Sequence, residues 1–275
     1  MLENPRSPRV RAVAKLTKRS ARTETGLFLL EGPQSVREAL EYRPEAIVEL
    51  FATPTGWEKH PDLRATSEQH SIEVEYVTEQ VLNAMADTVT PQGVIAVVQQ
   101  TPTSVRDIFA ASPRLVAICQ EVRDPGNLGT IIRAADAAGA DAVVLTGRTV
   151  DPYNPKVVRA TTGSLFHLPV SVGGELEDVV TRAHEAGLVV LAADVKGDDL
   201  LQARAEGVLA QPTAWLFGNE ARGLEESALE LADHVLKLPI FGRAESLNLA
   251  TAASVCLYES AFTQRAAEDP SVTTV

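Results

Sequence analysis

Three short segments in the second half of the chain combine glycine with polar side chains in patterns that could support binding and catalysis. The first, EVRDPGNLGTIIRAADAAGAD, occupies residues 121–141. It predicts a strand that runs into a Pro-Gly turn and then a helix, whose amino-terminal end favours anions. The glycines match only half of a dinucleotide-binding fingerprint, so this segment indicates an anion site without identifying the ligand.

The helix predicted at this segment has an apolar face and a polar side. Leu128, Ile131 and Ile132 share the apolar face. Asn127 and Arg133 lie along the other side. Taken alone, Arg133 is better explained by an ordinary surface arginine than by a functional one.

The second segment, AWLFGNEARGL, covers residues 214–224 and places Asn219, Glu220 and Arg222 directly after a buried strand. Ligands of open α/β sheets bind at the carboxyl ends of the strands. The polar group therefore lies where a binding site is expected, and a solvated turn is the alternative.

The third segment, KLPIFGRAESLNLATAASVCLYE, covers residues 237–259. An irregular loop precedes a helix for which Ser246 is the predicted N-cap, with Asn248 in the first turn. The small residues that follow allow this helix to approach another backbone closely. No histidine lies near Ser246 and no G-x-S-x-G is present, so the pattern does not indicate a nucleophilic serine.

The elements that must position these segments form two α/β domains. Residues 1–100 predict a small domain, residues 101–113 a proline-bounded linker, residues 114–265 a second domain, and residues 266–275 a polar tail. Short apolar runs are typical of parallel strands covered on both faces. Strand order alone predicts an open doubly wound sheet, because knotted chains are very rare.

The individual elements follow from apolar periodicity and from turn residues. Strands are predicted at 27–31, 46–52, 72–77, 93–98, 115–120, 142–145, 188–192, 214–217 and 235–238. Helices are predicted at 8–20, 33–42, 79–85, 127–138, 155–163, 175–186 and 246–264. Pro54, Gly56 and Pro61 predict that residues 53–69 contain no long element.

Composition narrows the function classes. The 275 residues are 45% hydrophobic and 23% charged, close to the globular average. No apolar run reaches the ~18 residues that a membrane helix requires, and the basic start is not followed by a signal-peptide core. Two cysteines and five scattered histidines predict a reducing cytoplasm, no disulfide framework and no metal site.

Charge is distributed unevenly along the chain. The net charge is −12, yet residues 1–22 carry seven basic residues and one acid, which leaves 25 − 7 = 18 basic against 37 − 1 = 36 acidic residues elsewhere. A basic arm on an acidic body predicts one local contact with an anionic partner, and a solvated helix is the alternative.

In this order and spacing, NLGTIIR, FGNEARGL and LPIFGRAESLNLA resemble the motifs of the SpoU/TrmH branch of the SPOUT RNA methyltransferases, over residues 113–264. TETGLFLLEG and PQGVIAVV make residues 8–98 similar to the ribosomal-protein-like domain that binds the RNA substrate in this family. The resemblance implies methyl transfer from S-adenosylmethionine to a ribose 2′-hydroxyl, with 23S ribosomal RNA as the expected substrate. It also implies a homodimer and a methyltransferase domain with a deep trefoil knot.

The functional residues that the resemblance implies are carried over motif by motif. The expected catalytic residues are Asn127, Arg133, Glu220, Ser246 and Asn248. The expected cofactor-binding residues are Gly218, Asn219, Leu238, Ile240 and Leu247. Because a guanidinium stays protonated, Arg133 is expected to bind phosphate and stabilise a developing alkoxide. Ser246 and Asn248 would orient the ribose or Arg133, and Glu220 would fix the arginine or the motif loops.

Three other functions remain open from the sequence. The substrate could be tRNA. The Gly-Asn-Leu-Gly turn alone could belong to a nicotinamide-dependent oxidoreductase, which would bind NAD in place of S-adenosylmethionine. The chain could also be a non-catalytic RNA-binding protein, although the five matched catalytic residues argue against lost activity.

Overall fold

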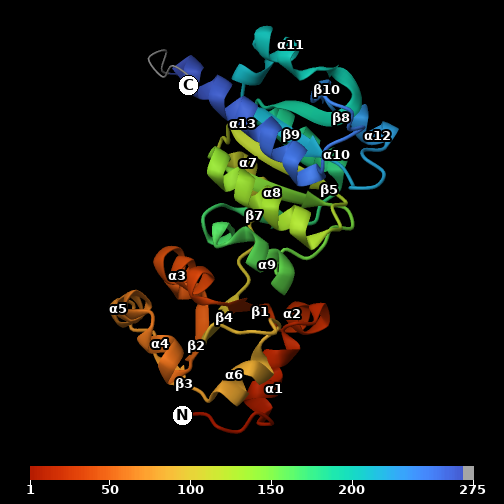
Figure 1. Cartoon of the computed structure of the whole chain (residues 1–275). Coiled ribbons are helices and arrows are strands. Elements are labelled where there is room, and N and C mark those ends of the chain that lie inside the picture. The colour runs from red at the N-terminus through yellow and green to blue at the C-terminus, as the bar shows by residue number, and fades with distance from the viewer. Residues whose placement is uncertain (269–275) are drawn as a thin grey trace. The chain divides into compact units, whose positions relative to one another are not determined.

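The computed structural model describes residues 1–268 and divides the chain into two compact units, both of α/β type (Figure 1). The first unit comprises Met1–Thr101 and Asp151–His167. The second comprises Pro102–Val150 and the residues from Leu168 onward. The segment 151–167, expected within the methyltransferase domain, thus belongs to the first unit.

The first unit is built on a four-stranded sheet in the order β1-β4-β2-β3. Its strands are β1 (Leu27–Glu31), β2 (Ile47–Ala52), β3 (Val74–Tyr76) and β4 (Val94–Gln99). β4 runs antiparallel to both of its neighbours, and β2 and β3 are parallel. The four predicted strands are confirmed, with ends shifted by one or two residues.

Helices cover both faces of this sheet. They are α1 (Pro8–Lys15), α2 (Arg19–Thr25), α3 (Pro33–Tyr42), α4 (Pro54–Glu58), α5 (Pro61–Gln69) and α6 (Glu79–Met85). One predicted helix over 8–20 is in fact two, α1 and α2. Residues 53–69 contain no long element, as predicted, but they do form two short helices that were not predicted. Pro54 and Pro61 start these helices, because proline is preorganised for the first turn, and Thr53 caps α4.

The segment 151–167 completes the core of the first unit with α9 (Pro155–Thr161). Tyr153 packs on Phe28, with ring centroids 4.9 Å apart. Arg22 is buried, and its guanidinium pairs with Asp151 at 2.8 Å and donates to the carbonyl of Leu16. A buried charge requires such a partner, so this pair and the ring contact both hold the segment 151–167 in the first unit.

The second unit contains a sheet of six parallel strands in the order β10-β8-β9-β5-β6-β7. They are β5 (Leu115–Gln120), β6 (Ala142–Thr146), β7 (Val170–Val172), β8 (Val189–Asp199), β9 (Thr213–Phe217) and β10 (His234–Lys237). Five of these strands were predicted. The edge strand β7 was not, because its three residues are too few to show a periodicity.

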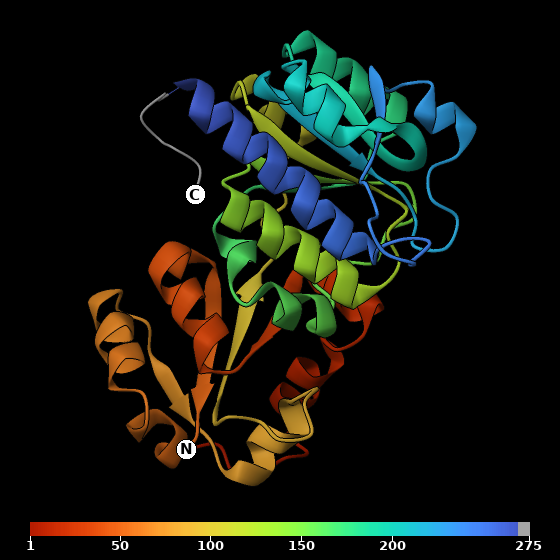
Figure 2. The ribbon, with the colours of Figure 1, turned by 45° about the horizontal axis from the view of Figure 1, so that its top comes forward.

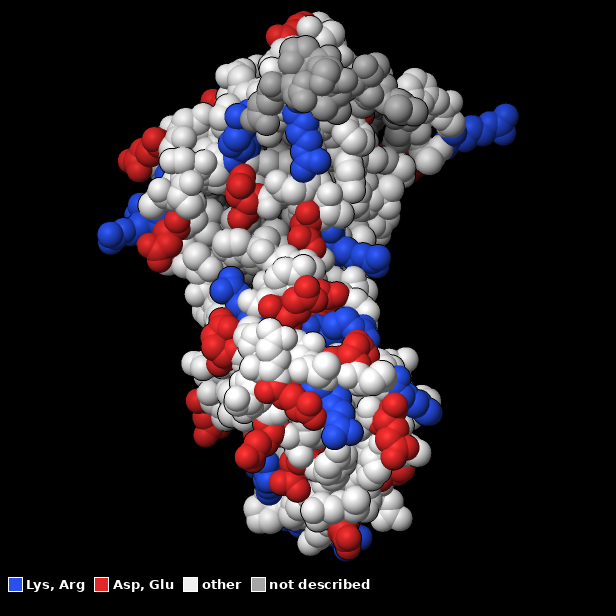
Figure 3. Space-filling model, turned by 90° about the vertical axis from the view of Figure 1, so that its left-hand side faces the viewer, with Lys and Arg blue, Asp and Glu red and all other residues white. Residues whose placement is uncertain are grey.

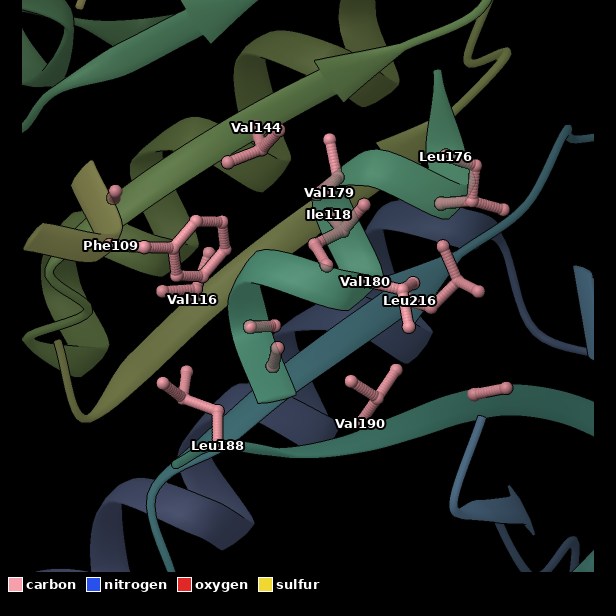
Figure 4. Packing of buried hydrophobic residues seen from close by; sticks show 14 of the residues in the cluster. Phe109, Val116, Ile118, Val144, Leu176, Val179, Val180, Leu188, Val190 and Leu216 are labelled. Atoms are coloured by element: carbon pink, nitrogen blue, oxygen red, sulfur yellow. The ribbon is translucent and has the colours of Figure 1, made fainter. Parts of the chain in front are cut away.

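Helices lie on both faces of the six-stranded sheet. On one face, α7 (Val105–Ala110) and α10 (Leu176–Glu185) pack apolar side chains against the strands, as Figure 4 shows for Phe109 and Val180. On the other face, α8 (Pro125–Ala138) and α13 (Leu249–Glu268) lie side by side (Figures 1 and 2). Two short helices, α11 (Leu200–Ala205) and α12 (Glu226–Leu229), complete the unit.

Two expectations about segment ends differ from the structure. Residues 105–110, expected within the linker, form α7, because Ser104 caps the helix and Ile108 and Phe109 are buried. α13 continues through residue 268, past the predicted start of the tail at 266. The rest of that predicted tail, residues 269–275, lies outside the described residues.

A candidate active site at the carboxyl ends of the parallel strands

Three loops of the second unit follow strands of the parallel sheet at their carboxyl ends. The loop 121–124 connects β5 to α8, the loop 218–225 follows β9, and the loop 238–248 connects β10 to α13. β5 and β9 are paired neighbours, so their loops emerge side by side. The sheet therefore gathers the three sequence segments at one edge, where α/β proteins bind ligands.

Glu220 links the second segment to the first. Its carboxylate accepts hydrogen bonds from the backbone N–H groups of Arg123 and Asp124, at 3.2 and 2.9 Å, and from Asn127 Nδ2 at 3.4 Å. Partial burial by itself would raise the pKa of Glu220, but these hydrogen bonds to the ionised form outweigh burial and lower the pKa below its usual value of 4.5. Glu220 is therefore a carboxylate acceptor at neutral pH.

Asn248 links the third segment to the first. Its Nδ2 donates to Asn127 Oδ1 at 2.9 Å. Its Oδ1 accepts from the N–H groups of Ala250 and Thr251, at 2.9 and 3.3 Å. Asn248 is thus the N-cap of α13, and the prediction of Ser246 for that role was wrong. α13 begins at Leu249, so Ser246 lies upstream of the helix.

A pocket of about 580 Å³ lies against the second and third loops. The expected residues that line it are Asn219, Glu220, Leu238, Ile240, Ser246 and Leu247. Gly218 is not among the lining residues, but it directly precedes Asn219 and packs against Gly223, which both line the pocket. A Cβ at Gly218 would lie 2.5 Å from the carbonyl carbon of Gly223, so only glycine lets these two backbone segments come so close.

Sequence reasoning missed one wall of the pocket. β8 contains a bulge between Ala192 and Asp198. These two residues are opposite Val235 and Leu236, which are consecutive in β10. The bulged residues 193–196 line the pocket, with Asp194 and Lys196 among them. The only sequence signal was Gly197, where a Cβ would lie 2.4 Å from the carbonyl oxygen of Val235.

Arg133 lies on α8 away from this network. Its side chain is exposed on the polar side of the helix, as predicted, and it is absent from the pocket lining. Among the described residues it takes part in none of the hydrogen bonds or ion pairs found. The structure therefore brings together Asn127, Glu220 and Asn248, with Ser246 at the adjacent pocket, and leaves Arg133 apart.

No described helix is long and apolar enough to cross a membrane. No cluster of three or more His, Cys, Asp or Glu side chains among residues 1–268 is arranged to hold a metal ion.

Comparison with known proteins identifies the family to which the chain belongs. Residues 114–258 match the SpoU rRNA Methylase family, and residues 7–96 match the MRM3-like substrate binding domain. The chain belongs to the SpoU rRNA methylase family. The expected resemblance is thus confirmed for both halves of the chain, and the oxidoreductase alternative has no support.

Relatives of the SpoU family match the chain over most of its length. It is 34% identical to "23S rRNA (guanosine(2553)-2'-O)-methyltransferase RlmP" of Bacillus subtilis strain 168, over 94% of this chain and 97% of the relative. It is 33% identical to "23S rRNA (uridine(2479)-2'-O)-methyltransferase" of Streptomyces viridochromogenes, over 90% and 86% of the two chains. The AdoMet-bound rRNA methyltransferase structure from Sinorhizobium meliloti superposes with a TM-score of 0.79 at 32% identity, over 94% and 96% of the chains. These matches confirm the predicted α/β fold, with a small α/β domain before a methyltransferase domain built on a parallel sheet.

Proposed function

We propose that the chain transfers a methyl group from S-adenosylmethionine to a ribose 2′-hydroxyl of ribosomal RNA, with 23S rRNA as the substrate. The observation that carries the proposal is the hydrogen-bonded joining of the three family motifs. Glu220 holds the start of α8, and Asn248 joins Asn127 to the start of α13, beside a pocket that Glu220 also lines. The names of the two curated relatives support both the reaction and the RNA.

The pocket fits S-adenosylmethionine in size and in chemistry. Its volume lies within the ~300–1,000 Å³ usual for small-molecule sites. Gly223 lines the pocket without a side chain, and Leu247 adds apolar surface suited to an adenine ring. The carboxylates of Asp194 and Glu220 suit a positively charged sulfonium. When bound, the cofactor supplies a methyl group on that sulfonium.

The residues of the chain then have separate roles in the transfer. The methyl carbon–sulfur bond breaks as the bond to the 2′-oxygen forms, and the hydroxyl proton leaves to water or to a substrate phosphate. Arg133 binds the phosphate and stabilises the negative charge on the oxygen, because its guanidinium does not give up its proton at neutral pH. Ser246, exposed at the pocket, orients the ribose. Glu220 and Asn248 hold the loops, since their polar atoms are already engaged.

A homodimer is part of this proposal, with each active site completed by the second chain. Apolar side chains are exposed on and before α13: Phe241 is 90% exposed, Val255 38% and Phe262 43%. Val255 and Phe262 are seven residues apart and so share one face of the helix. Arg133, absent from the pocket of its own chain, would serve the site of the partner. An active species with the mass of one chain in light scattering would contradict the dimer.

A trefoil knot is also proposed for the second unit. The knot would be formed by the loops after β9 and β10 together with α13. Ala250 and Ala253 are buried near the start of α13, which supports a close passage of this helix past the loops. A chain trace in a crystal structure at high resolution decides between the knot and the open sheet.

RNA binding by the basic arm, residues 1–22, is the third part of the proposal. The structure reduces the number of its cations that are available for RNA. Arg9 pairs with Glu49, and Arg22 is buried against Asp151. The remaining exposed cations on and beside α1 and α2 take part in no ion pair found among the described residues: Arg6, Arg11, Lys15, Lys18 and Arg19. The opposite side of the first unit, in the lower part of Figure 3, instead carries interspersed acidic and basic side chains.

The cytoplasm is the proposed compartment. Cys119 and Cys256 are free thiols. Burial raises the pKa of the Cys119 thiol to about 12, so it stays protonated at neutral pH. Buried, unpaired thiols fit a reducing environment and exclude these two residues as nucleophiles.

The decisive experiment methylates ribosomal RNA with labelled S-adenosylmethionine and then maps the modified ribose. The proposal expects label in one 2′-O-methylated nucleotide of 23S rRNA, and Arg133→Ala serves as the inactive control. Label found only in tRNA would support the alternative substrate. Absence of label from every RNA, with cofactor binding intact, would favour the non-catalytic alternative.

A further inference from the structure

Glu121, which the family motifs do not include, connects the end of β5 to the loop after β9. We propose that Glu121 is a positioning residue whose carboxylate holds Arg222 and thereby fixes one side of the cofactor pocket. The inference rests on the cofactor assignment made above, and its tests measure binding and local order separately from methyl transfer.

The backbone of Glu121 adopts a conformation that side chains rarely take. Its φ is 53°, in the left-handed region where glycine is the least costly residue. Hydrogen bonds hold the residue there from both sides. Its N–H donates to the carbonyl of Thr146 at 3.1 Å, and its carbonyl accepts from Asn219 Nδ2 at 2.9 Å. A glutamate at such a position has a conformational cost, which its side chain must offset.

The side chain of Glu121 makes a contact that glycine could not make. Its Oε2 accepts a short hydrogen bond from Arg222 Nη2 and lies 3.6 Å from Arg123 Nη2. The Glu121 side chain is 25% exposed and the Arg222 side chain 57%, so water screens this ion pair mainly from the Arg222 side. Arg222 lines the cofactor pocket, and this contact therefore reaches the ligand site.

Arg222 belongs to a tight turn whose two ends are held together. Asn219 N–H donates to the carbonyl of Gly223 at 3.1 Å, and Gly223 N–H donates to the carbonyl of Asn219 at 2.9 Å. Glu220 attaches this turn to the start of α8. Asn219 Nδ2 joins the turn to the Glu121 carbonyl, and both of these attachments lie on the Asn219–Glu220 side of the turn. The Glu121 carboxylate adds a further attachment through Arg222, which restricts rotation of the other side of the turn.

A turn fixed before the ligand arrives lowers the entropic cost of binding. Loss of the Glu121 carboxylate should therefore weaken binding of S-adenosylmethionine while leaving the arrangement of the bound state almost unchanged. The signature expected of this role is a raised Kd with a nearly unchanged kcat at saturating cofactor.

The experiment compares the wild type with Glu121→Gln, Arg222→Gln, the double variant, and the reversed pair Glu121→Arg with Arg222→Glu. Calorimetry with S-adenosylmethionine alone should show a Kd about threefold to tenfold higher for Glu121→Gln. The Kd of the double variant for S-adenosylmethionine should be no higher than that of the single variant with the higher Kd. Hydrogen exchange of the Gly223 amide in the free protein should become faster in both single variants, and the reversed pair should recover part of the affinity.

Glu259→Gln is the matched control, because Glu259 is 20% exposed and pairs with Arg204 at 2.8 Å outside the pocket. It should leave the Kd and the exchange of Gly223 unchanged. An unchanged Kd in Glu121→Gln would overturn the proposal, as would additive effects in the double variant. A lower kcat with an unchanged Kd would also overturn it, since Glu121 would then act on the transfer itself.

Discussion

Asn248 donates a 2.9 Å hydrogen bond to Asn127 although the two residues are 121 positions apart in the chain. The same Asn248 side chain caps α13 through its carbonyl oxygen. Asn127 lies in the first turn of α8, so this single contact joins the amino-terminal ends of the two helices that lie side by side on the sheet. A change at Asn248 should therefore affect helix stability and active-site geometry together.

Replacement of Asn248 tests this double role. Asn248→Ala should lower the free energy of unfolding by about 1 kcal/mol, the usual cost of a lost N-cap. Asn248→Asp keeps an acceptor for the cap but removes the donor to Asn127, so it should retain most of the stability and still lose methyl transfer. Ser246→Ala is the control, because Ser246 does not cap the helix. Thermal unfolding and transfer assays separate these outcomes, and equal stability of Asn248→Ala and the wild type would contradict the cap.

Arg133→Ala should nearly abolish methyl transfer and leave cofactor affinity close to that of the wild type. Arg133 is exposed and outside the pocket lining, so its loss should affect neither the fold nor the cofactor site. Single-turnover assays and calorimetry are the measurements. Normal turnover in Arg133→Ala would remove Arg133 from the reaction.

Acid should weaken the link that Glu220 makes between the motifs. Because the pKa of Glu220 is lower in the folded state than its usual value of 4.5, the ionised carboxylate stabilises the fold above that pH. This stabilisation is lost as the pH falls through the folded-state pKa. Glu220→Gln should therefore be less stable than the wild type at pH 7, and the difference should shrink toward pH 3. A stability difference between the two proteins that stays constant from pH 7 to pH 3 would contradict a stabilising role of the ionised Glu220 carboxylate.

The basic arm should act through its unpaired cations alone. Replacement of Arg11, Lys15, Lys18 and Arg19 by Gln should flatten the log–log salt dependence of RNA binding by roughly 3, at about 0.7 for each lost phosphate contact on single-stranded RNA. Arg9→Gln is the matched control, because Arg9 is already paired with Glu49. Equal slopes for all three proteins would identify the arm as a solvated surface.

The buried pair of Arg22 and Asp151 should behave differently from the exposed cations. Arg22→Ala leaves the carboxylate of Asp151 without its partner and should cost about 3–5 kcal/mol of stability. Thermal unfolding measures this, with Arg19→Ala as the neighbouring control. A loss of stability in Arg22→Ala as small as that in Arg19→Ala would mean that water solvates Asp151 in place of Arg22.

The sequence predicted the parallel strands because their apolar runs are bounded by turns, and it predicted the motif residues because they follow those strands. It did not predict the bulge of β8 that carries Asp194 and Lys196, since a bulge depends on pairing with a strand about 40 residues away. Asn248 was missed as a cap because Ser246 also suits that role, and only the start of α13 at Leu249 distinguishes them. The burial of Arg22 could not be predicted, because the sequence does not distinguish it from the other six basic residues of 1–22.

The first unit is built from two separate segments of the chain, which limits how this protein can be divided into fragments. The chain passes between the two units three times, at residues 101, 150 and 167, so no single cut separates them. A fragment ending at residue 101 would lack Asp151 and Tyr153, and a fragment starting at 102 would carry α9 without the core it completes. The substrate-binding part is therefore not an exchangeable cassette. Any natural or engineered recombination that replaces it must also replace residues 151–167 inside the methyltransferase sequence.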